Sequence, residues 1–162
     1  MNKITGTISA SDLLNAQRLH REKTVRWLYA GGGIVAVVGV GLLGLENKMF
    51  ALVLIGGGLG AVIGELITSA IVLPKKVRRM YRQLKDLSSP FTYSWDAEFL
   101  EAQGRSGHSK REWRNYVKFK ENEKLFLLYH ADNIFEMLPK SWFQDQAQVA
   151  DFRSHARRAG EA

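Results

Sequence analysis

The chain has 162 residues, contains no cysteine and carries a formal net charge of +7. Without cysteine it can form no disulfide framework, thiolate zinc site or cysteine nucleophile. Ten of the 23 basic residues but only one of the 16 acidic residues lie in two short stretches, 18–26 and 75–85. The remaining residues are slightly acidic, so we expect no nucleic-acid partner despite the positive charge.

The first 26 residues predict a short strand followed by an amphipathic helix. Ile4–Ile8 alternates apolar and polar residues, which is typical of a strand. Ser11 or Asp12 is a suitable N-cap for the helix. Only the triplet Gly31–Gly33 interrupts the residues that follow, so we expect this helix to continue into the apolar segment after it.

Two long apolar segments come next. Residues 27–45 hold no charge, and residues 49–73 hold one ionisable group, Glu65. A hydrocarbon core of about 30 Å needs about 20 residues of helix, so each segment is long enough to span it. Backbone amides in lipid must be satisfied within their own segment, which makes both segments helices. Residues 27–73 therefore predict a transmembrane hairpin, and the first segment is too long for the core of a cleavable signal peptide.

The charges that flank the hairpin predict its orientation. Both outer ends are basic, whereas the loop between the helices carries only Glu46 and Lys48. By the positive-inside rule we expect both termini in the cytoplasm, together with residues 1–26 and 88–162.

Residues 74–87 predict a basic juxtamembrane helix. Its apolar residues recur on one face, and Pro74 predicts a kink or a new helix start. The basic side chains either serve only to fix the topology or also bind anionic lipid headgroups. This basic cluster consists of Lys75, Lys76, Arg78, Arg79, Arg82 and Lys85.

Small residues line both predicted membrane helices. Lipid offers no hydrophobic drive for helix association, so close packing through small residues replaces it. These faces predict either packing within the hairpin or a homo-oligomer. The positions are Gly56, Gly60 and Gly64 in the second helix, and Gly32, Ala36 and Gly44 in the first.

Glu65 is the single acid inside the second apolar segment. If the hairpin turns at Asn47, Glu65 lies level with Tyr29 and one turn from Arg26. A hydrogen bond to Tyr29 or an ion pair with Arg26 would satisfy the carboxylate structurally. The alternative is a protonatable carboxylate in an ion path, which intramembrane acids often provide.

Residues 88–162 predict a small α+β domain. Alternating and apolar runs indicate an antiparallel meander whose strands are separated by turn residues. The runs are 91–95, 98–103, 113–120, 125–130 and 134–138, with a turn at 104–107. A terminal helix is expected over about 145–159, with Asp145 and Gln148 at its start and Gly160 at its end. Its buried stripe is expected to be Val149, Phe152 and Ala156.

Segments of this region resemble the YcxB-like family of bacterial membrane proteins. The similar segments are 112–117, 125–129 and 137–143. Trp113 stands before one strand, and Pro139 with Lys140 stands before the last helix, as in the family. The resemblance extends to the order of strand, helix, membrane hairpin and C-terminal domain over nearly the whole chain. It implies a bacterial inner-membrane protein with a pleckstrin-homology-like cytoplasmic domain, and it implies no established activity.

No catalytic constellation is recognisable in the sequence. The four histidines, His20, His108, His130 and His155, show no metal-ligand spacing. Ser106 and Ser109 flank His108, but a serine nucleophile needs its base across space rather than beside it in sequence. We therefore expect no enzymatic activity, no cofactor and no metal.

Two functions are compatible with these observations. The favoured one is a membrane-anchored, non-enzymatic interaction or regulatory module whose cytoplasmic domain binds an unknown protein, a peptide or a lipid headgroup. The alternative is a small oligomeric ion or proton conductor that uses Glu65.

Overall fold

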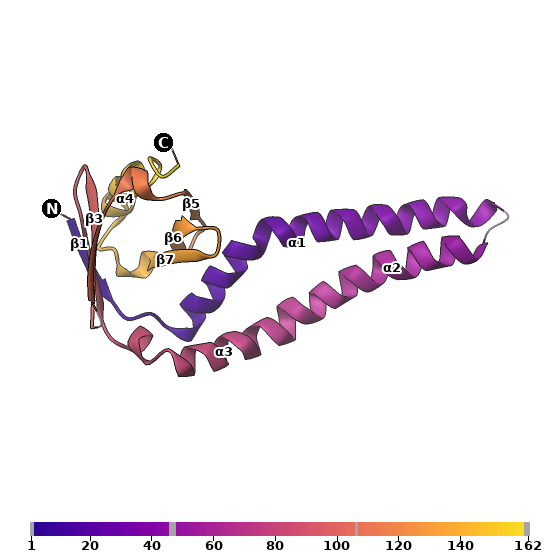
Figure 1. Cartoon of the computed structure of the whole chain (residues 1–162), viewed down its shortest axis with the longest axis horizontal. Helices are drawn as coiled ribbons and strands as arrows, with labels where there is room; N and C mark the ends of the chain where they lie inside the picture. The colour runs from indigo at the N-terminus through magenta and orange to yellow at the C-terminus, as the bar shows by residue number, and fades with distance from the viewer. Residues whose placement is uncertain (1, 46–47, 106, 161–162) are drawn as a thin grey trace. The chain divides into compact units, whose positions relative to one another are not determined.

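The computed structural model describes residues 2–45, 48–105 and 107–160 (Figure 1). The chain divides into two compact units, one formed by Met1–Leu19 with Val77–Ala162 and one formed by His20–Lys76. The domain predicted for residues 88–162 thus includes the N-terminal strand and the first turns of the first helix. Residues 46 and 47 of the predicted hairpin loop, residue 106 of the predicted turn at 104–107 and the side chain of Lys85 lie outside the described part.

Helix α1 (Ala10–Gly41) runs without interruption through the triplet Gly31–Gly33, as expected. Its cap is Ser9 rather than Ser11 or Asp12. The Ser9 hydroxyl accepts a hydrogen bond from the Asp12 backbone N–H (3.1 Å), and the Asp12 carboxylate accepts one from the Ser9 N–H (2.9 Å). This reciprocal capping box satisfies two amide groups that the first helical turn leaves without partners.

The second long helix changes its winding before it ends. Helix α2 (Lys48–Ile67) passes into a π-helical segment, Thr68–Val72, and then into α3 (Leu73–Gln83). The Thr68 hydroxyl donates a hydrogen bond to the Gly64 carbonyl at 2.8 Å, which occupies a carbonyl of the turn before the π segment. The irregularity expected at Pro74 therefore lies about one turn earlier, in this π-helical segment, and Pro74 follows as the second residue of α3.

The hairpin is held by small residues spaced by seven. Gly32 and Gly39 on α1 and Ala51 and Gly58 on α2 are buried against the opposite helix. A Cβ atom at Gly39 would lie 2.9 Å from the Ala51 carbonyl oxygen, and one at Gly58 would overlap the Gly32 backbone. As a face packed within the hairpin, the prediction is correct for Gly32 and Ala36, which lie against Gly58, and wrong for Gly44 and for the second helix. A Cβ atom at Gly44, Gly56, Gly60 or Gly64 would have no neighbour within 4 Å.

The outer surface of this hairpin is apolar. Of the 21 large hydrophobic side chains exposed in the described residues, 18 lie between Trp27 and Val72. Two helical stretches, Ala10–Gly44 and Lys48–Gln83, are long and apolar enough to cross a membrane. Only 6% and 17% of their most apolar windows are buried, so they do not resemble core helices of a soluble protein.

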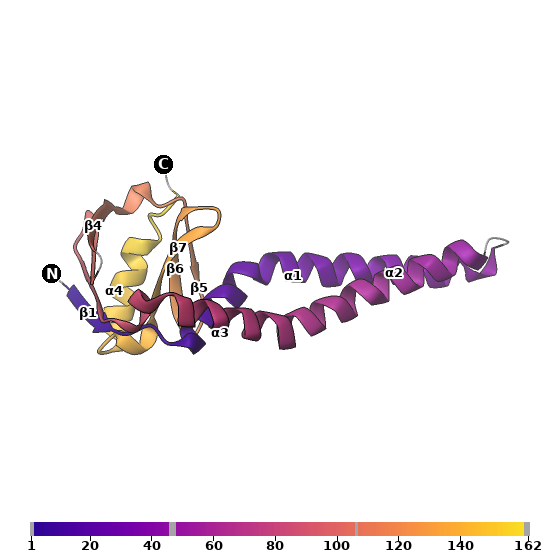
Figure 2. The ribbon, with the colours of Figure 1, turned by 60° about the horizontal axis from the view of Figure 1, so that its bottom comes forward.

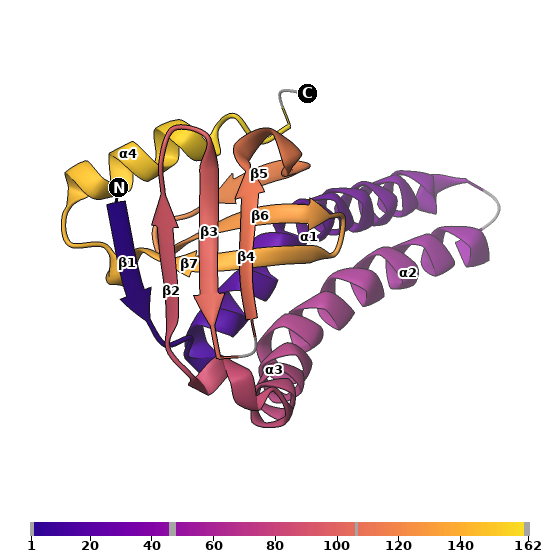
Figure 3. The ribbon, with the colours of Figure 1, turned by 60° about the vertical axis from the view of Figure 1, so that its left-hand side comes forward.

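The other unit contains two antiparallel sheets and a helix (Figure 3). The first sheet has the order β1 (Asn2–Gly6), β2 (Phe91–Trp95), β3 (Phe99–Gly104) and β4 (Gly107–Glu112). The second has the order β5 (Lys118–Glu121), β6 (Leu125–Ala131) and β7 (Ile134–Pro139). Helix α4 (Gln146–Ala156) follows.

Most of the expected elements are confirmed, with shifts at their ends. The strand expected at 113–120 begins instead as a 3-10 turn, Trp113–Asn115, and β4 was not expected. The N-terminal strand lies two residues earlier than predicted. Asp145 caps α4 by accepting from the Gln148 N–H at 2.7 Å, as predicted, but the helix ends at Ala156. Gly160, with φ +84°, follows as part of the turn after α4.

The second sheet is buried on both faces. Phe126 and Leu128 belong to a core cluster with Val149, Phe152 and Ala156 of α4. Leu125, Leu127 and Tyr129 alternate with them and are also buried, so they point to the opposite face. There the Lys120 ammonium donates to the Leu19 carbonyl at 3.2 Å, and the first turns of α1 lie beside this sheet (Figure 2). The continuous apolar run of β6 is explained by this double burial.

Candidate functional site

Glu65 is buried, and its carboxylate accepts three hydrogen bonds. Its carboxylate receives two hydrogen bonds from the Arg21 guanidinium, at 3.1 and 3.0 Å. The Ser69 hydroxyl donates a third at 2.6 Å, from the π-helical segment. The residue is 7% exposed, and a single guanidinium nitrogen of Arg21, Nη2, contacts both of its carboxylate oxygens in a charge-assisted pair.

The predicted partners of Glu65, Tyr29 and Arg26, are replaced by Arg21. Counting from the turn predicts the level of a residue along the helix but not the face on which it lies. Arg21 is 18 residues before the buried Gly39, which is about five full turns, so the two share a face. Arg26 and Tyr29 are turned from that face by about 140° and 80°. The heptad spacing of the small residues was the signal that could have identified Arg21.

The predicted basic cluster lies on and just after α3. Leu73 and Val77 are buried, and the Tyr81 hydroxyl donates to the Ile8 carbonyl at 2.9 Å. The apolar face of α3 is therefore packed against protein and is not free to enter lipid, as an interfacial helix would require. The exposed basic residues are Lys75, Lys76, Arg78, Arg79 and Arg82. Lys85 begins the following 3-10 turn, Lys85–Ser88.

Lys140 joins three elements of the β domain. Its ammonium forms an ion pair with Glu121 at the end of β5, and lies 4.7 Å from the centre of the Phe126 ring. Arg153 of α4 donates to both carboxylate oxygens of Glu121, at distances of 2.6 to 2.9 Å. Burial raises the pKa of Glu121, but the hydrogen bonds from Arg153 and Lys140 outweigh it, and the net pKa lies below 4.5. Pro139 is the last residue of β7 and sets the chain into the 3-10 turn that carries Lys140.

Trp113 is a core residue that also forms the wall of a pocket. It is 2% exposed, and its indole N–H donates to the Asp96 carbonyl at 3.0 Å. Its ring meets that of Phe152 edge-on at 5.5 Å and stacks on His155 at 5.7 Å. These contacts fix the tryptophan against α4 and the β2–β3 turn.

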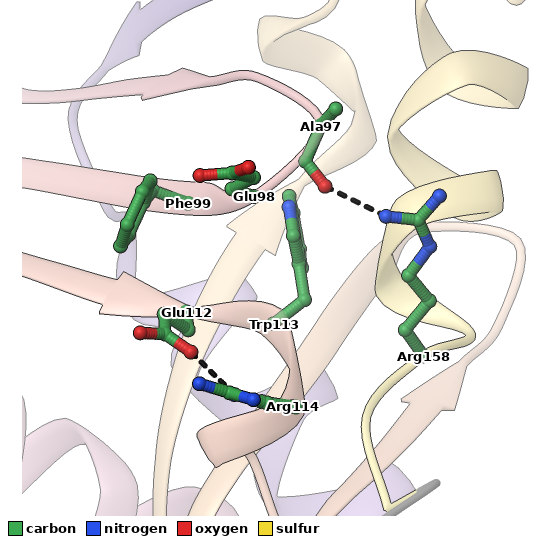
Figure 4. Close-up of a pocket in the computed structure, with 7 residues that line it drawn as sticks. All are labelled: Ala97, Glu98, Phe99, Glu112, Trp113, Arg114 and Arg158. Atoms are coloured by element: carbon green, nitrogen blue, oxygen red, sulfur yellow. Dashed lines mark hydrogen bonds and ion pairs between the residues drawn. The ribbon is translucent and has the colours of Figure 1, made fainter.

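The pocket beside Trp113 has a volume of about 470 Å³ and carries charges of both signs (Figure 4). The Arg158 guanidinium donates to the Ala97 carbonyl at 2.7 Å, and Arg114 pairs with Glu112 two residues before it in the lining. Hydrogen-bond donors and acceptors therefore surround an aromatic wall. The lining residues are Ala97, Glu98, Phe99, Glu112, Trp113, Arg114 and Arg158.

Asp96 holds the turn at the rim of this pocket. Its carboxylate accepts hydrogen bonds from the backbone N–H groups of Glu98 and Phe99, both at 2.8 Å. These bonds stabilise the charged form and lower the pKa of Asp96 below 3.8. The turn is thus tied down where it forms the pocket edge.

Comparison with known proteins identifies the segment that contains these residues. Residues 95–156 match the family model described as YcxB-like protein. The chain carries a YcxB-like domain. The resemblance seen in the sequence is confirmed over this segment, which includes Trp113, Pro139 and Lys140. No curated protein and no solved structure matches the chain.

The histidines of the YcxB-like domain pair singly with carboxylates. His130 Nε2 lies 2.9 Å from Glu136, which also accepts from the Tyr116 hydroxyl at 3.3 Å. Burial and the Glu136 charge raise the pKa of Tyr116 above its ordinary value. Among the described residues, no three His, Cys, Asp or Glu side chains come together as a metal site.

Sequence reasoning missed Glu121 and Arg153 as partners of Lys140, and Asp151 as a junction in the YcxB-like domain. The Asp151 carboxylate accepts from the Trp95 indole N–H at 2.8 Å and from the Asn2 side chain at 2.7 Å. These residues are far apart in the chain, and nothing in their local spacing predicts that they meet.

Proposed function

We propose that this protein is a membrane-anchored, non-enzymatic interaction module. In this proposal the two apolar helices cross the inner membrane of a bacterium, both termini lie in the cytoplasm, and the YcxB-like domain is presented at the membrane surface. The domain is inferred to be pleckstrin-homology-like. The antiparallel sheets of four and three strands with a C-terminal helix support this inference.

The observation that carries the proposal is the place of the hairpin in the chain. Strand β1 pairs with β2, residue for residue from Asn2 opposite Trp95 to Gly6 opposite Phe91, yet the whole apolar hairpin lies between them in sequence. The domain is therefore attached to the hairpin through two neighbouring strands.

The pocket beside Trp113 supports a polypeptide as the partner. An extended peptide carries N–H and C=O groups that need acceptors and donors alike, and Glu98, Glu112, Arg114 and Arg158 offer both. The aromatic wall supplies apolar contact for one side chain.

The contacts of Glu65 give no support to the alternative of an ion or proton conductor. Among the described residues, its three hydrogen bonds come from Arg21 and Ser69, which belong to the same compact unit, His20–Lys76. We therefore expect Glu65→Gln to leave ion flux across reconstituted vesicles unchanged. If the wild-type protein conducts ions and Glu65→Gln abolishes that flux with the fold intact, the ion conductor would be favoured over the interaction module.

Two measurements test the module. Because the chain has no cysteine, single substitutions Lys48→Cys and Gln103→Cys report sidedness through a membrane-impermeant maleimide. We expect labelling at position 48 in intact cells, and at position 103 only after permeabilisation. Labelling of both in intact cells, or a protein released by alkaline extraction, would contradict the anchoring.

The interaction itself is tested with a photoreactive amino acid at position 114 in the pocket and, as the control, at position 154. Ser154 is exposed on α4 and does not line the pocket. Irradiation of cells is expected to yield a discrete protein adduct from position 114 only. Equal adducts from both positions, or none from the pocket, would remove the pocket as the docking place.

A further inference from the structure

Helix α3 carries an unpaired band of positive charge. Its apolar side is occupied by protein contacts, as the buried Leu73 and Val77 and the hydrogen bond of Tyr81 show. The five exposed bases cover an arc of roughly 160° on the other side, given about 100° per residue. They are Lys75, Lys76, Arg78, Arg79 and Arg82. Within the described part of the chain, no carboxylate forms an ion pair with any of them.

The chain places this band close to the end of the apolar surface. Val72 is exposed and apolar, and Lys75 follows three residues later on a continuous helix. At about 1.5 Å rise per residue, the bases lie at most about 5 to 15 Å from Val72 along the axis. A headgroup layer is about 5 to 8 Å thick, and the Debye length at physiological salt is about 8 Å. Most of the band is therefore within reach of lipid phosphates.

We propose that the exposed face of α3 binds the headgroups of anionic phospholipids in the leaflet that the hairpin enters. This rests on the proposed membrane anchoring. Since the apolar face of α3 is packed against protein, the attraction is electrostatic and does not depend on insertion of the helix among acyl chains. The preference for anionic lipid should accordingly fall with salt and with each charge removed.

The experiment uses the full chain in nanodiscs that contain spin-labelled phosphatidylglycerol or phosphatidylcholine. Nanodiscs expose both membrane faces, so a change of topology in cells does not affect the result. The motionally restricted fraction of each lipid gives a relative association constant. We expect about a fivefold preference for phosphatidylglycerol at low salt, falling toward equality at high salt.

The variant K75Q/K76Q/R78Q/R79Q/R82Q should lose the preference, and K76Q/R79Q should show an intermediate value. The control R105Q/K124Q/R157Q neutralises three exposed bases outside α3, one more than K76Q/R79Q, and should retain the preference. The proposal would be overturned if the wild-type protein showed no lipid preference, or if the α3 variant retained the preference in full. The charges would then serve only to fix the topology. If neither lipid shows a restricted component, the anchoring itself has failed, which separates the two proposals.

Discussion

At the scale of single residues, Glu121 is the junction of the YcxB-like domain. It receives Lys140 from the turn after β7 and Arg153 from α4, and the three side chains are between 17% and 30% exposed. A partly buried acid with two bases is stabilised in its charged form, and removing that charge leaves both bases without their partner. The ion pair with Glu121 is what gives Lys140 its structural role.

We expect Glu121→Gln to lower the free energy of unfolding by about 2 kcal/mol, below the value for a fully buried pair because water still reaches the side chains. Thermal or denaturant unfolding of the full chain in detergent measures this. Glu112→Gln is the control, since its pair with Arg114 is exposed and should cost less than about 0.5 kcal/mol. Equal losses in the two variants would contradict the assignment.

The stability difference between the wild type and Glu121→Gln is expected to depend on pH. The folded-state pKa of Glu121 is lowered below 4.5, so its contribution is present above that value and is lost as the pH falls through the folded pKa. The stability difference between wild type and Glu121→Gln should therefore shrink below pH 4.5. A difference that stays constant down to pH 3 would show that the charge is not responsible.

At the scale of elements, the hairpin seam depends on backbone approach at particular glycines. Gly58 contacts the Gly32 backbone, whereas Gly60, two residues later on the same helix, has nothing within 4 Å of its Cβ position. Both lie in the same glycine-rich run, and only their faces differ.

Gly58→Ala should destabilise the hairpin because a methyl group would overlap the backbone of α1, which cannot move aside as a flexible side chain would. Gly60→Ala should be neutral or stabilising by up to about 1 kcal/mol, since alanine favours the helix. Thermal stability in detergent compares them. If Gly60→Ala is the more harmful, residues 56, 60 and 64 face another chain, and the oligomer expected from sequence gains its support.

The sequence predicted features that depend on neighbouring residues more accurately than contacts between residues far apart in the chain. Alternation and turn residues placed β2, β6 and β7 almost to the residue, because those signals are local. Strand β4 was missed because His108–Glu112 is polar on both faces, as an edge strand can be. The partners of Glu65 and Lys140 depend on helix faces and on distant segments. Local spacing carries no information about Glu121 meeting Arg153.

At the scale of the whole molecule, the YcxB-like domain is assembled from both ends of the chain. The family match covers residues 95–156, yet β1 contributes Ile4, 2% exposed, to the same core. A side chain of β1, Asn2, also bonds Asp151 of α4. The residues after the hairpin do not by themselves complete the domain.

Deletion of residues 1–6 should therefore destabilise the domain, by about 3 kcal/mol or more, although it leaves the hairpin and residues 95–156 intact. The loss combines an edge strand with buried apolar area of the core. Proteolysis of α4 and β6 followed in membranes reports it. Replacing residues 1–6 with a polar peptide should not rescue the fold, whereas unchanged protease resistance would show that β1 is dispensable.

The apolar hairpin that lies between β1 and β2 in sequence also separates these two strands in time during synthesis. Between the last residue of β1 and the first of β2, Gly6 and Phe91, the chain makes both apolar helices. At about 5 to 20 residues per second, about 4 to 17 seconds pass between the synthesis of β1 and the synthesis of β2. Both apolar helices are therefore synthesised before β1 and β2 can pair. Pairing of β1 with β2 therefore marks a chain in which the whole hairpin has already been made.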